Sequence, residues 1–298
     1  MRIALAGATG LIGHAVAETL AAGGHEIVRI GRGEGNEVRV DLARSSSLPR
    51  RALAGCDVLV HAAGVTDEDF ADREAAWAKA IFGAGALLAA AREAGVARLA
   101  CISSAHVYGP LEGRIDESCA ANPLSDYAIA HFAGEQLFRR AARDCGASAL
   151  LVRPCAVFGM PLAFERFARW SLIPFDFPRQ ALSGRIVLKS TGMQRRNFVS
   201  TEGLAYLVGW WLGQPAHGTT VANAPGPSEM SVFDFAGLCA RIANEETGRD
   251  CRVERPAPQA EAPNPFEYRT RVGGHLPGTT LEDHVRGLVR ALSRKAHS

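Results

Sequence analysis

Apolar and polar positions follow a repeated strand-then-helix order along the first half of the chain. Residues 2–7 form a short apolar run that predicts a buried strand, and apolar residues then recur at helical spacing over 11–20. Five further strands are predicted at 26–31, 37–42, 57–64, 97–104 and 149–154, and two long helices over 69–94 and 125–145. Strands that alternate with helices indicate a parallel sheet with helices on both faces.

The pattern becomes less regular after Gly159. Short helices are predicted over 162–172, 201–213, 231–246 and 280–294, and short strands near 185–190, 195–200 and 219–223. We therefore expect residues 1–160 to form the parallel-sheet domain. Residues 161–298 are expected to form a smaller α/β lobe, with the elements of the two parts partly interleaved.

A glycine-rich turn joins the first strand to the first helix. Its residues are Gly7, Ala8, Thr9, Gly10, Leu11, Ile12 and Gly13. Glycines at such a junction let the backbone turn tightly and approach a phosphate, whose charge meets the amides of the helix N-terminus. In this strand–turn–helix context the motif predicts a Rossmann-type doubly wound sheet that binds a dinucleotide at the carboxyl ends of its strands.

Composition narrows the class of protein. The chain has 298 residues, of which 47% are hydrophobic and 21% charged, values typical of a soluble globular protein with a large core. The formal net charge of +2 gives no reason to expect nucleic acid or an anionic membrane as a partner. The N-terminal apolar stretch leads into glycines and lacks the features of a signal peptide, so we expect a cytoplasmic protein.

Cysteine and histidine positions give no metal or disulfide signal. The seven cysteines include no C-x-x-C pair, which favours reduced thiols. The nine histidines fall at no metal-ligand spacing. We therefore expect no metal cofactor.

Several motifs, taken together and in order, resemble the extended short-chain dehydrogenase/reductase superfamily. The resemblance is to the NAD-dependent epimerase/dehydratase family and its nucleotide-sugar branch, and it runs over nearly the whole chain. The motifs are the glycine turn, Asp41-Leu42, residues 61–64 (His-Ala-Ala-Gly), residues 103–109 around Ser104, Tyr127, residues 153–159 from Arg153-Pro154, and residues 196–199 from Arg196.

The resemblance implies a set of cofactor contacts. The glycine turn would hold the pyrophosphate, Asp41 would accept a hydrogen bond from the adenine amino group, and Leu42 would pack on the ring. Pro154 would flank the nicotinamide. The wall beside the adenosine ribose and diphosphate would be formed by Ala62, Ala63 and Gly64.

The residue after the second strand bears on the choice between NAD and NADP. An acidic residue there would bind the ribose hydroxyls and repel a 2′-phosphate. This chain has Gly31-Arg32-Gly33, with no carboxylate before Glu34. Because a guanidinium suits bidentate phosphate binding, NADP is favoured and NAD is possible. The alternatives are that Glu34 turns in or that Arg32 stacks on adenine.

The catalytic positions of the superfamily are matched by Ser104 and Tyr127, with one departure. Ser104 would hydrogen-bond the reacting oxygen and Tyr127 would act as acid or base. The family's lysine, four residues after the tyrosine, is replaced here by His131, which shares a helix face with Tyr127. A histidine is largely neutral at pH 7, so it would lower the tyrosine pKa less than a permanent cation. Ala80 stands where many members have an asparagine.

Three readings follow from these residues. The first is an NAD(P)-dependent sugar-nucleotide epimerase or ketoreductase with a tyrosine acid/base. The second is a cofactor-binding protein of the same superfamily with weak or no turnover, because His131 replaces the lysine. The third is a Rossmann-fold enzyme outside this superfamily in which the matches of Ser104 and Tyr127 are coincidental.

Two further positions are candidates for the substrate. Arg196 matches a position near the substrate diphosphate in the sugar-nucleotide branch, although it could be a solvated surface charge. His106, two residues after Ser104, faces the substrate or is an ordinary loop histidine. The resemblance also implies a homodimer formed through the two long helices of the cofactor domain.

Overall fold

A computed structural model describes residues 1–44, 49, 51–257 and 265–296 of the chain. Its main feature is a seven-stranded sheet in the order β11-β7-β5-β4-β1-β2-β3, in which every pairing is parallel. The fold class expected from the sequence, a Rossmann-type doubly wound parallel sheet, is therefore confirmed. The strands are β1 (Arg2–Ala6), β2 (Glu26–Gly31), β3 (Val38–Arg39), β4 (Val58–His61), β5 (Arg98–Ile102), β7 (Ser148–Pro154) and β11 (Thr219–Ala224).

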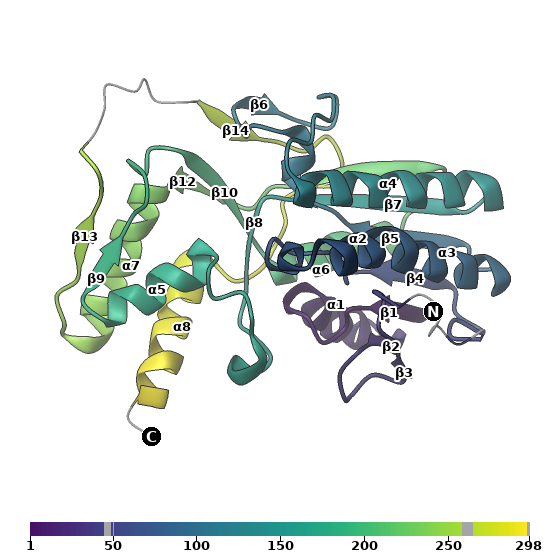
Figure 1. Ribbon diagram of the computed structural model, residues 1–298, viewed down its shortest axis with the longest axis horizontal. Coiled ribbons are helices and arrows are strands. Elements are labelled where there is room, and N and C mark those ends of the chain that lie inside the picture. The colour runs from purple at the N-terminus through teal and green to yellow at the C-terminus, as the bar shows by residue number, and fades with distance from the viewer. Residues whose placement is uncertain (45–48, 50, 258–264, 297–298) are drawn as a thin grey trace.

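Helices cover both faces of this sheet (Figure 1). On one face α1 (Leu11–Ala22) and α6 (Thr201–Leu212) pack together and share a core with the sheet. On the other face α3 (Ala84–Glu93) and α4 (Asp126–Cys145) bury Leu87 and Phe138 in a second core. Because both faces are covered, the central strands are buried and predominantly apolar, as is typical of parallel sheets.

The predicted helix over 69–94 is wrong in detail, because the chain forms four shorter elements there. A 3-10 turn, η2 (Glu68–Ala71), precedes α2 (Arg73–Trp77), and a π-helical turn, η3 (Ala78–Gly83), leads into α3. Asp72 makes the first break: its backbone is extended, and its side chain accepts a hydrogen bond from the Ala75 amide at 3.1 Å. An N-cap of this kind starts a new helix.

Two other boundaries also differ from the prediction. The third strand is only β3, which pairs at two positions with β2 before Asp41 accepts a hydrogen bond from Ala43 and turns the chain. The helix expected over 162–172 is reduced to the 3-10 turn η5 (Phe164–Arg166), and the regular helix α5 (Ile173–Leu182) begins later. Pro174 lies in the first turn of α5, where proline is favoured.

Two elements beyond residue 160 belong to the large sheet layer. Helix α6 packs against α1, and β11 pairs with β7 at the edge of the sheet. The chain thus returns from the C-terminal part to the N-terminal one, so the two are interleaved. The division at residue 160 stays a prediction.

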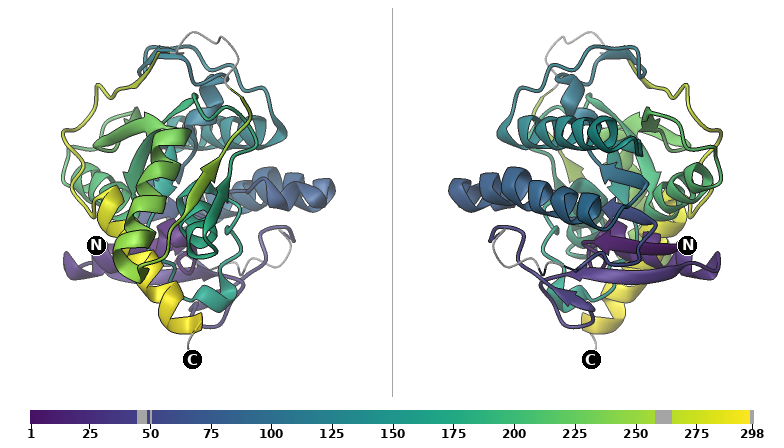
Figure 2. Two further views of the ribbon diagram at one scale, coloured as in Figure 1. Left: turned by 90° about the vertical axis from the view of Figure 1, so that its left-hand side faces the viewer. Right: turned by 90° about the vertical axis from the view of Figure 1, so that its right-hand side faces the viewer.

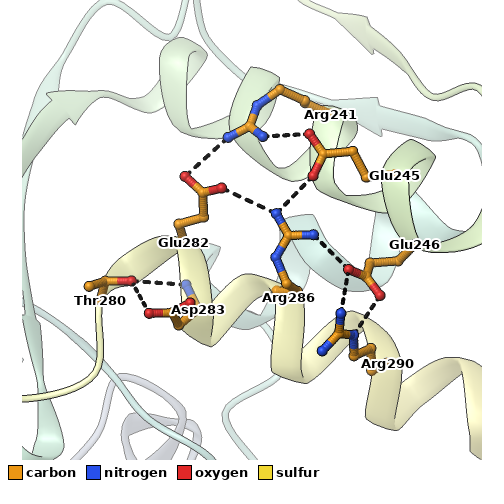
Figure 3. A network of polar contacts seen from close by, with 8 residues as sticks. All are labelled: Arg241, Glu245, Glu246, Thr280, Glu282, Asp283, Arg286 and Arg290. Carbon is orange, nitrogen blue, oxygen red and sulfur yellow. Dashed lines mark hydrogen bonds and ion pairs between the residues drawn. The ribbon is translucent and has the colours of Figure 1, made fainter.

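Most of the remaining C-terminal elements form a third core (Figures 1 and 2). Strands β8 (Ala156–Phe158), β10 (Arg195–Ser200) and β12 (Ser228–Ser231) form one small sheet, and β9 (Arg185–Val187) pairs with β13 (Arg252–Glu254). The apolar faces of α5, α7 (Val232–Thr247) and α8 (Leu281–Ala296) pack here. A network of surface charges joins α7 to α8: Arg241, Glu245, Glu246, Glu282, Arg286 and Arg290 (Figure 3).

The stretch Arg73–Glu93 would pass a length and composition test for a membrane span. The same test is passed by core helices of soluble proteins. Here Leu87 and Leu88 of this stretch are buried in the core beneath the sheet. This packing accounts for its apolar composition without a bilayer.

A buried ion pair fastens α4 to the sheet. Arg153 at the end of β7 donates from Nε and Nη2 to the two carboxylate oxygens of Glu135, at 2.8 and 2.6 Å, and both side chains are almost inaccessible to solvent. Its guanidinium lies over the Tyr108 ring, 4.7 Å from the centroid. The Tyr268 hydroxyl, on β14 (Phe266–Tyr268), donates to the Arg153 carbonyl at 2.6 Å. Strand β14 pairs with β6 (Gly113–Ile115) beside the 3-10 turn η4 (Ala105–Tyr108).

Removing one member of this pair should destabilise the fold strongly. Arg153→Met leaves the Glu135 carboxylate buried without its partner, so we expect the free energy of unfolding to fall by about 3–5 kcal/mol. The double variant Glu135→Leu with Arg153→Met should recover most of that loss. The control is Arg140→Met, which breaks an exposed ion pair with Asp144 on α4. It should lower the free energy of unfolding by less than about 1 kcal/mol. Urea unfolding measures all three. Equal losses for Arg153→Met and Arg140→Met would contradict the assigned importance of the buried pair.

Candidate active site

The turn between β1 and α1 depends on two close backbone approaches. Gly7 has a φ of +86°, and a Cβ there would lie 2.7 Å from the Ala63 amide nitrogen. A Cβ on Gly13 would lie 2.0 Å from the Gly7 carbonyl oxygen. Only glycine fits at either position. The N-terminus of α1 begins at Gly10 without a side-chain cap, so its first amides are open to an anion.

One cavity of about 960 Å³ runs from this turn to the C-terminal elements. Almost every site residue predicted from the sequence lines it, although the residues come from widely separated parts of the chain. They are Gly7, Thr9, Gly10, Leu11, Ile12, Arg32, Asp41, Leu42, Ala62, Ala63, Gly64, Ser104, His106, Tyr127, His131, Pro154 and Arg196. Gly13 is the exception: it faces the Gly7 carbonyl rather than the cavity, and it lets α1 approach the turn.

The end of β2 carries the exposed side chain of Arg32 at the edge of the cavity. The turn that follows is held by buried Asn36, whose Nδ2 donates to the Gly33 carbonyl at 2.8 Å. Glu34 is exposed and does not line the cavity, whereas Asp41 and Leu42 do. The arginine, and not the nearby glutamate, therefore faces the cavity at this point.

Tyr127 and Ser104 are brought together from two elements. Ser125 caps α4 by accepting a hydrogen bond from the Ala128 amide at 3.2 Å, which places Tyr127 in the first turn of the helix. Ser104 follows β5 and is buried, and its hydroxyl is a hydrogen-bond partner of the Tyr127 phenol. The His106 ring lies 6.1 Å from the Tyr127 ring, edge to face.

The pKa of Tyr127 is raised above its ordinary value. Burial is the main cause, because it disfavours the charged phenolate. The hydrogen bond from Ser104 and the positive charge of Arg169 act in the opposite direction. At neutral pH the phenol therefore carries its proton.

His131 packs directly against Tyr127, with ring centroids 4.4 Å apart. Its Nε2 lies 3.1 Å from the Val65 carbonyl oxygen, so this nitrogen carries the hydrogen and donates it. Burial lowers the pKa of His131 to about 4, and the positive charges of Arg169 and Lys79 add to the effect. His131 is therefore neutral at pH 7. A Cβ on Gly64 would lie 2.8 Å from the His131 ring, so the glycine makes room for it.

Sequence reasoning missed two cations that line the cavity. Lys79 lies on the π-helical turn η3 and forms an ion pair with Asp69 at 2.9 Å. It directly precedes Ala80, where many family members have an asparagine. That departure was the one sequence signal near Lys79. Arg169 precedes α5, and no local pattern indicated it, because only the packing of the C-terminal segment brings it to the cavity.

Comparison with solved structures supports the fold. The whole chain superposes on the whole of MoeE5, solved with UDP-glucose and NAD, with a TM-score of 0.82 and 22% sequence identity. At that identity the similarity establishes the architecture alone.

Comparison with known sequences establishes the family. The chain is 25% identical over 160 residues to an uncharacterised UDP-glucose epimerase, YtcB, of Bacillus subtilis (strain 168), which covers 54% of this chain and 49% of that protein. It is 29% identical over 174 residues, 53% of this chain and 51% of the other, to a 4-hydroxy-2-methyl-3-oxo-4-farnesyl-3,4-dihydroquinoline-1-oxide ketoreductase of Stigmatella aurantiaca. The matched region spans about half the length of each of these curated relatives. The sequence model of the NAD dependent epimerase/dehydratase family matches residues 3–223. The chain therefore belongs to the NAD-dependent epimerase/dehydratase family.

Proposed function

We propose that this protein is an NAD(P)-dependent epimerase or ketoreductase that acts on a nucleotide sugar, with Tyr127 as its acid/base. One observation carries the proposal: the Tyr127 phenol and its Ser104 partner lie in the same cavity as the glycine turn. A group held at the turn can therefore extend to the phenol. The solved MoeE5 structure, whose fold this chain shares, contains both UDP-glucose and NAD.

The residues present fit a dinucleotide. The uncapped N-terminus of α1 offers backbone amides to a pyrophosphate, and Gly7 and Gly10 leave no side chain in the way. Asp41 and Leu42 would hold the adenine, and the small residues 62–64 would let the ribose and diphosphate lie against β4. Pro154 would flank the nicotinamide. When bound, the nicotinamide ring supplies or accepts the hydride.

Tyr127 would move the proton that accompanies the hydride. When a substrate hydroxyl is oxidised, the phenolate takes its proton; when a carbonyl is reduced, the phenol returns it. Ser104 would hydrogen-bond the reacting oxygen. Arg196 and His106 would contact the substrate, Arg196 near its diphosphate. Burial, reinforced by the charge of Arg196, lowers the pKa of His106, so this ring would donate or accept as a neutral group.

We further propose that NADP is preferred over NAD. Arg32, which directly follows β2, lines the cavity, whereas Glu34 does not. A guanidinium in this place would pair with a 2′-phosphate. The structural relative MoeE5 contains NAD, which makes direct measurement of both dinucleotides necessary.

The neutral His131 favours a second candidate function. A protein of this family without a cation beside its tyrosine could bind the cofactor and turn over weakly or not at all. The low pKa of His131 supports this alternative. Turnover that depends on Tyr127 would exclude it.

We also propose a cytoplasmic homodimer formed through η3, α3 and α4. These helices lie side by side on one face of the molecule in both views of Figure 2. Phe82 on η3 and Ile129 on α4 are large apolar residues that are exposed there, at 66% and 42% of their surface. A second copy would cover them.

Replacing Tyr127 tests the proposed chemistry. With UDP-glucose and related nucleotide sugars as substrates, Tyr127→Phe should lower kcat by about 100-fold or more, because the proton has no donor or acceptor. Bound dinucleotide, measured by mass spectrometry after purification, should be retained. Tyr206→Phe, an exposed tyrosine on α6, is the matched control and should leave kcat unchanged. Unchanged turnover in Tyr127→Phe would refute the assignment.

Replacing Arg32 tests the cofactor preference. Arg32→Ala should weaken NADP binding by about 10- to 100-fold, since charge-assisted hydrogen bonds contribute about 1.5–3 kcal/mol. NAD binding should change little. Calorimetric titration with both dinucleotides measures the ratio, and Arg39→Ala, an exposed arginine on β3 outside the cavity, is the control. Equal weakening for NAD and NADP would argue against a phosphate contact.

A charge at Phe82 tests the dimer. Phe82→Glu should convert the dimer to a monomer, because the carboxylate would be buried against an apolar partner surface. Light scattering gives the mass. Val187→Glu, on the exposed strand β9 of the other part of the molecule, should leave the mass unchanged. A wild-type protein that is already monomeric would end this proposal.

A further inference from the structure

The site contains a tyrosine without an adjacent cation on its own helix. His131 occupies the position one turn after Tyr127, but it is neutral at pH 7 and its Nε2 is committed to the Val65 carbonyl. Burial meanwhile stabilises the protonated phenol. A tyrosine that is protonated in this way cannot take a proton from a substrate hydroxyl. A positive charge elsewhere in the cavity would stabilise its phenolate and let it act as the base.

Arg169 lines the same cavity as Tyr127 and His131. It belongs to the segment between η5 and α5, in the C-terminal part of the chain. Its Nε is buried and has no hydrogen-bond partner among the residues that the structure describes. A buried guanidinium nitrogen with an unused hydrogen is costly unless it serves something else.

The segment that carries Arg169 is fixed to the sheet domain. The hydroxyl of Ser171, two residues later, donates to a carboxylate oxygen of Glu68 at 2.7 Å, and Glu68 begins η2. The Leu172 amide donates to the Arg169 carbonyl at 3.3 Å, which folds the segment into a turn. The position of Arg169 is therefore set by the bond from Ser171 to Glu68 and by this turn.

We propose that Arg169 supplies Tyr127 with the permanent positive charge that His131 cannot provide. This inference rests on the proposed function, because it concerns the same tyrosine. Arg169 is a positioning residue: it acts through the phenol, whose charged form it stabilises across the cavity. The positive charge would then come from the segment between η5 and α5 rather than from the helix that carries the tyrosine.

The electrostatics agree with this geometry. The charge of Arg169 lowers the pKa of Tyr127, against the larger effect of burial, and it also lowers the pKa of His131. Asp67 and Glu68 act on Tyr127 in the opposite direction. The groups that face the phenol from all surrounding elements are Ser104, His106, His131, Asp67, Glu68 and Arg169.

The other cations of the cavity are less suited to the role. Lys79 is paired with Asp69, and its charge acts on His61 and His131. Arg196 donates to its neighbour's carbonyl at 2.8 Å and acts on His106. Arg32 lies at the end of β2, beside the predicted ribose site. Among the cavity cations of the described residues, Arg169 is therefore the one whose charge reaches both Tyr127 and His131.

The test is a direct titration of Tyr127 in the full-length protein. The four tyrosines are replaced by 3-fluorotyrosine, whose phenol titrates at lower pH and keeps the measurement within the range of the folded protein, and each is followed by 19F NMR. The Tyr127→Phe variant identifies the signal. Arg169→Gln should raise the Tyr127 pKa by about one unit or more, because the phenolate loses the positive charge that stabilises it. Arg169→Lys should leave it close to wild type.

Two further variants sharpen the test. Arg166→Gln removes an exposed arginine from the same segment, outside the cavity, and should not shift the signal. Arg169→Gln combined with His131→Lys places an ammonium one helical turn from Tyr127, and should bring the pKa back down. A phenol that titrates equally in wild type and Arg169→Gln would overturn the inference. A double variant that titrates no lower than Arg169→Gln would also overturn it, because charge would not be the cause.

Kinetics separate this role from substrate binding. Arg169→Gln should lower kcat and shift the pH–rate profile toward higher pH, and Arg169→Lys should restore both. An increase in KM alone, with an unshifted profile, would instead assign Arg169 to an anionic group of the substrate. The NMR titration needs no turnover. An inactive wild-type protein would thus refute the proposed function while the titration still decided the role of Arg169.

Discussion

The bidentate ion pair between Glu135 and Arg153 is the contact on which the geometry of the site depends. Glu135 lies on α4, one helical turn after His131 and two turns after Tyr127. Arg153 directly precedes Pro154, the last residue of β7. The pair therefore fixes the helix of the tyrosine at one height against the strand that borders the predicted nicotinamide site. Two buried charges are costly, and bidentate hydrogen bonds in a dry environment offset that cost only in one geometry. The Glu135–Arg153 ion pair therefore contributes more to the precise placement of α4 against β7 than to the net stability of the fold.

The cavity is shaped by residues that lack side chains. Gly7 permits the turn to touch the backbone at Ala62 and Ala63, directly after β4, Gly13 brings α1 against that turn, and Gly64 leaves space for the His131 ring. Each of these approaches is too close for a Cβ. The open amides of α1 and the phenol of Tyr127 are consequently held in one cavity by backbone packing.

His131 contributes packing to the site rather than charge. Its imidazole lies against the Tyr127 ring, tilted by 58°, and donates a hydrogen bond to the Val65 carbonyl. Its burial removes its charge, because a low-dielectric site penalises the imidazolium and nearby cations add to the penalty. A cation contributed by the C-terminal segment would restore the balance. The pKa of Tyr127 would then also depend on the position of that segment. A lysine on the helix of the tyrosine would not create this dependence.

The sequence by itself determined the strand–helix alternation of the first half, the parallel sheet, and a set of predicted site residues of which all but Gly13 line the cavity. These follow from local signals: hydrophobic period, glycine turns and short motifs at strand ends, which a parallel sheet necessarily gathers along one edge. The break at Asp72 and the π-helical turn were not readable, because they depend on a side-chain cap and on packing against the loop at Leu42. Likewise, the partner of Arg153, the burial that lowers the pKa of His131 to about 4 and the approach of Arg169 were decided by tertiary structure alone. Each depends on contacts between residues distant in the chain, and on the burial that those contacts create.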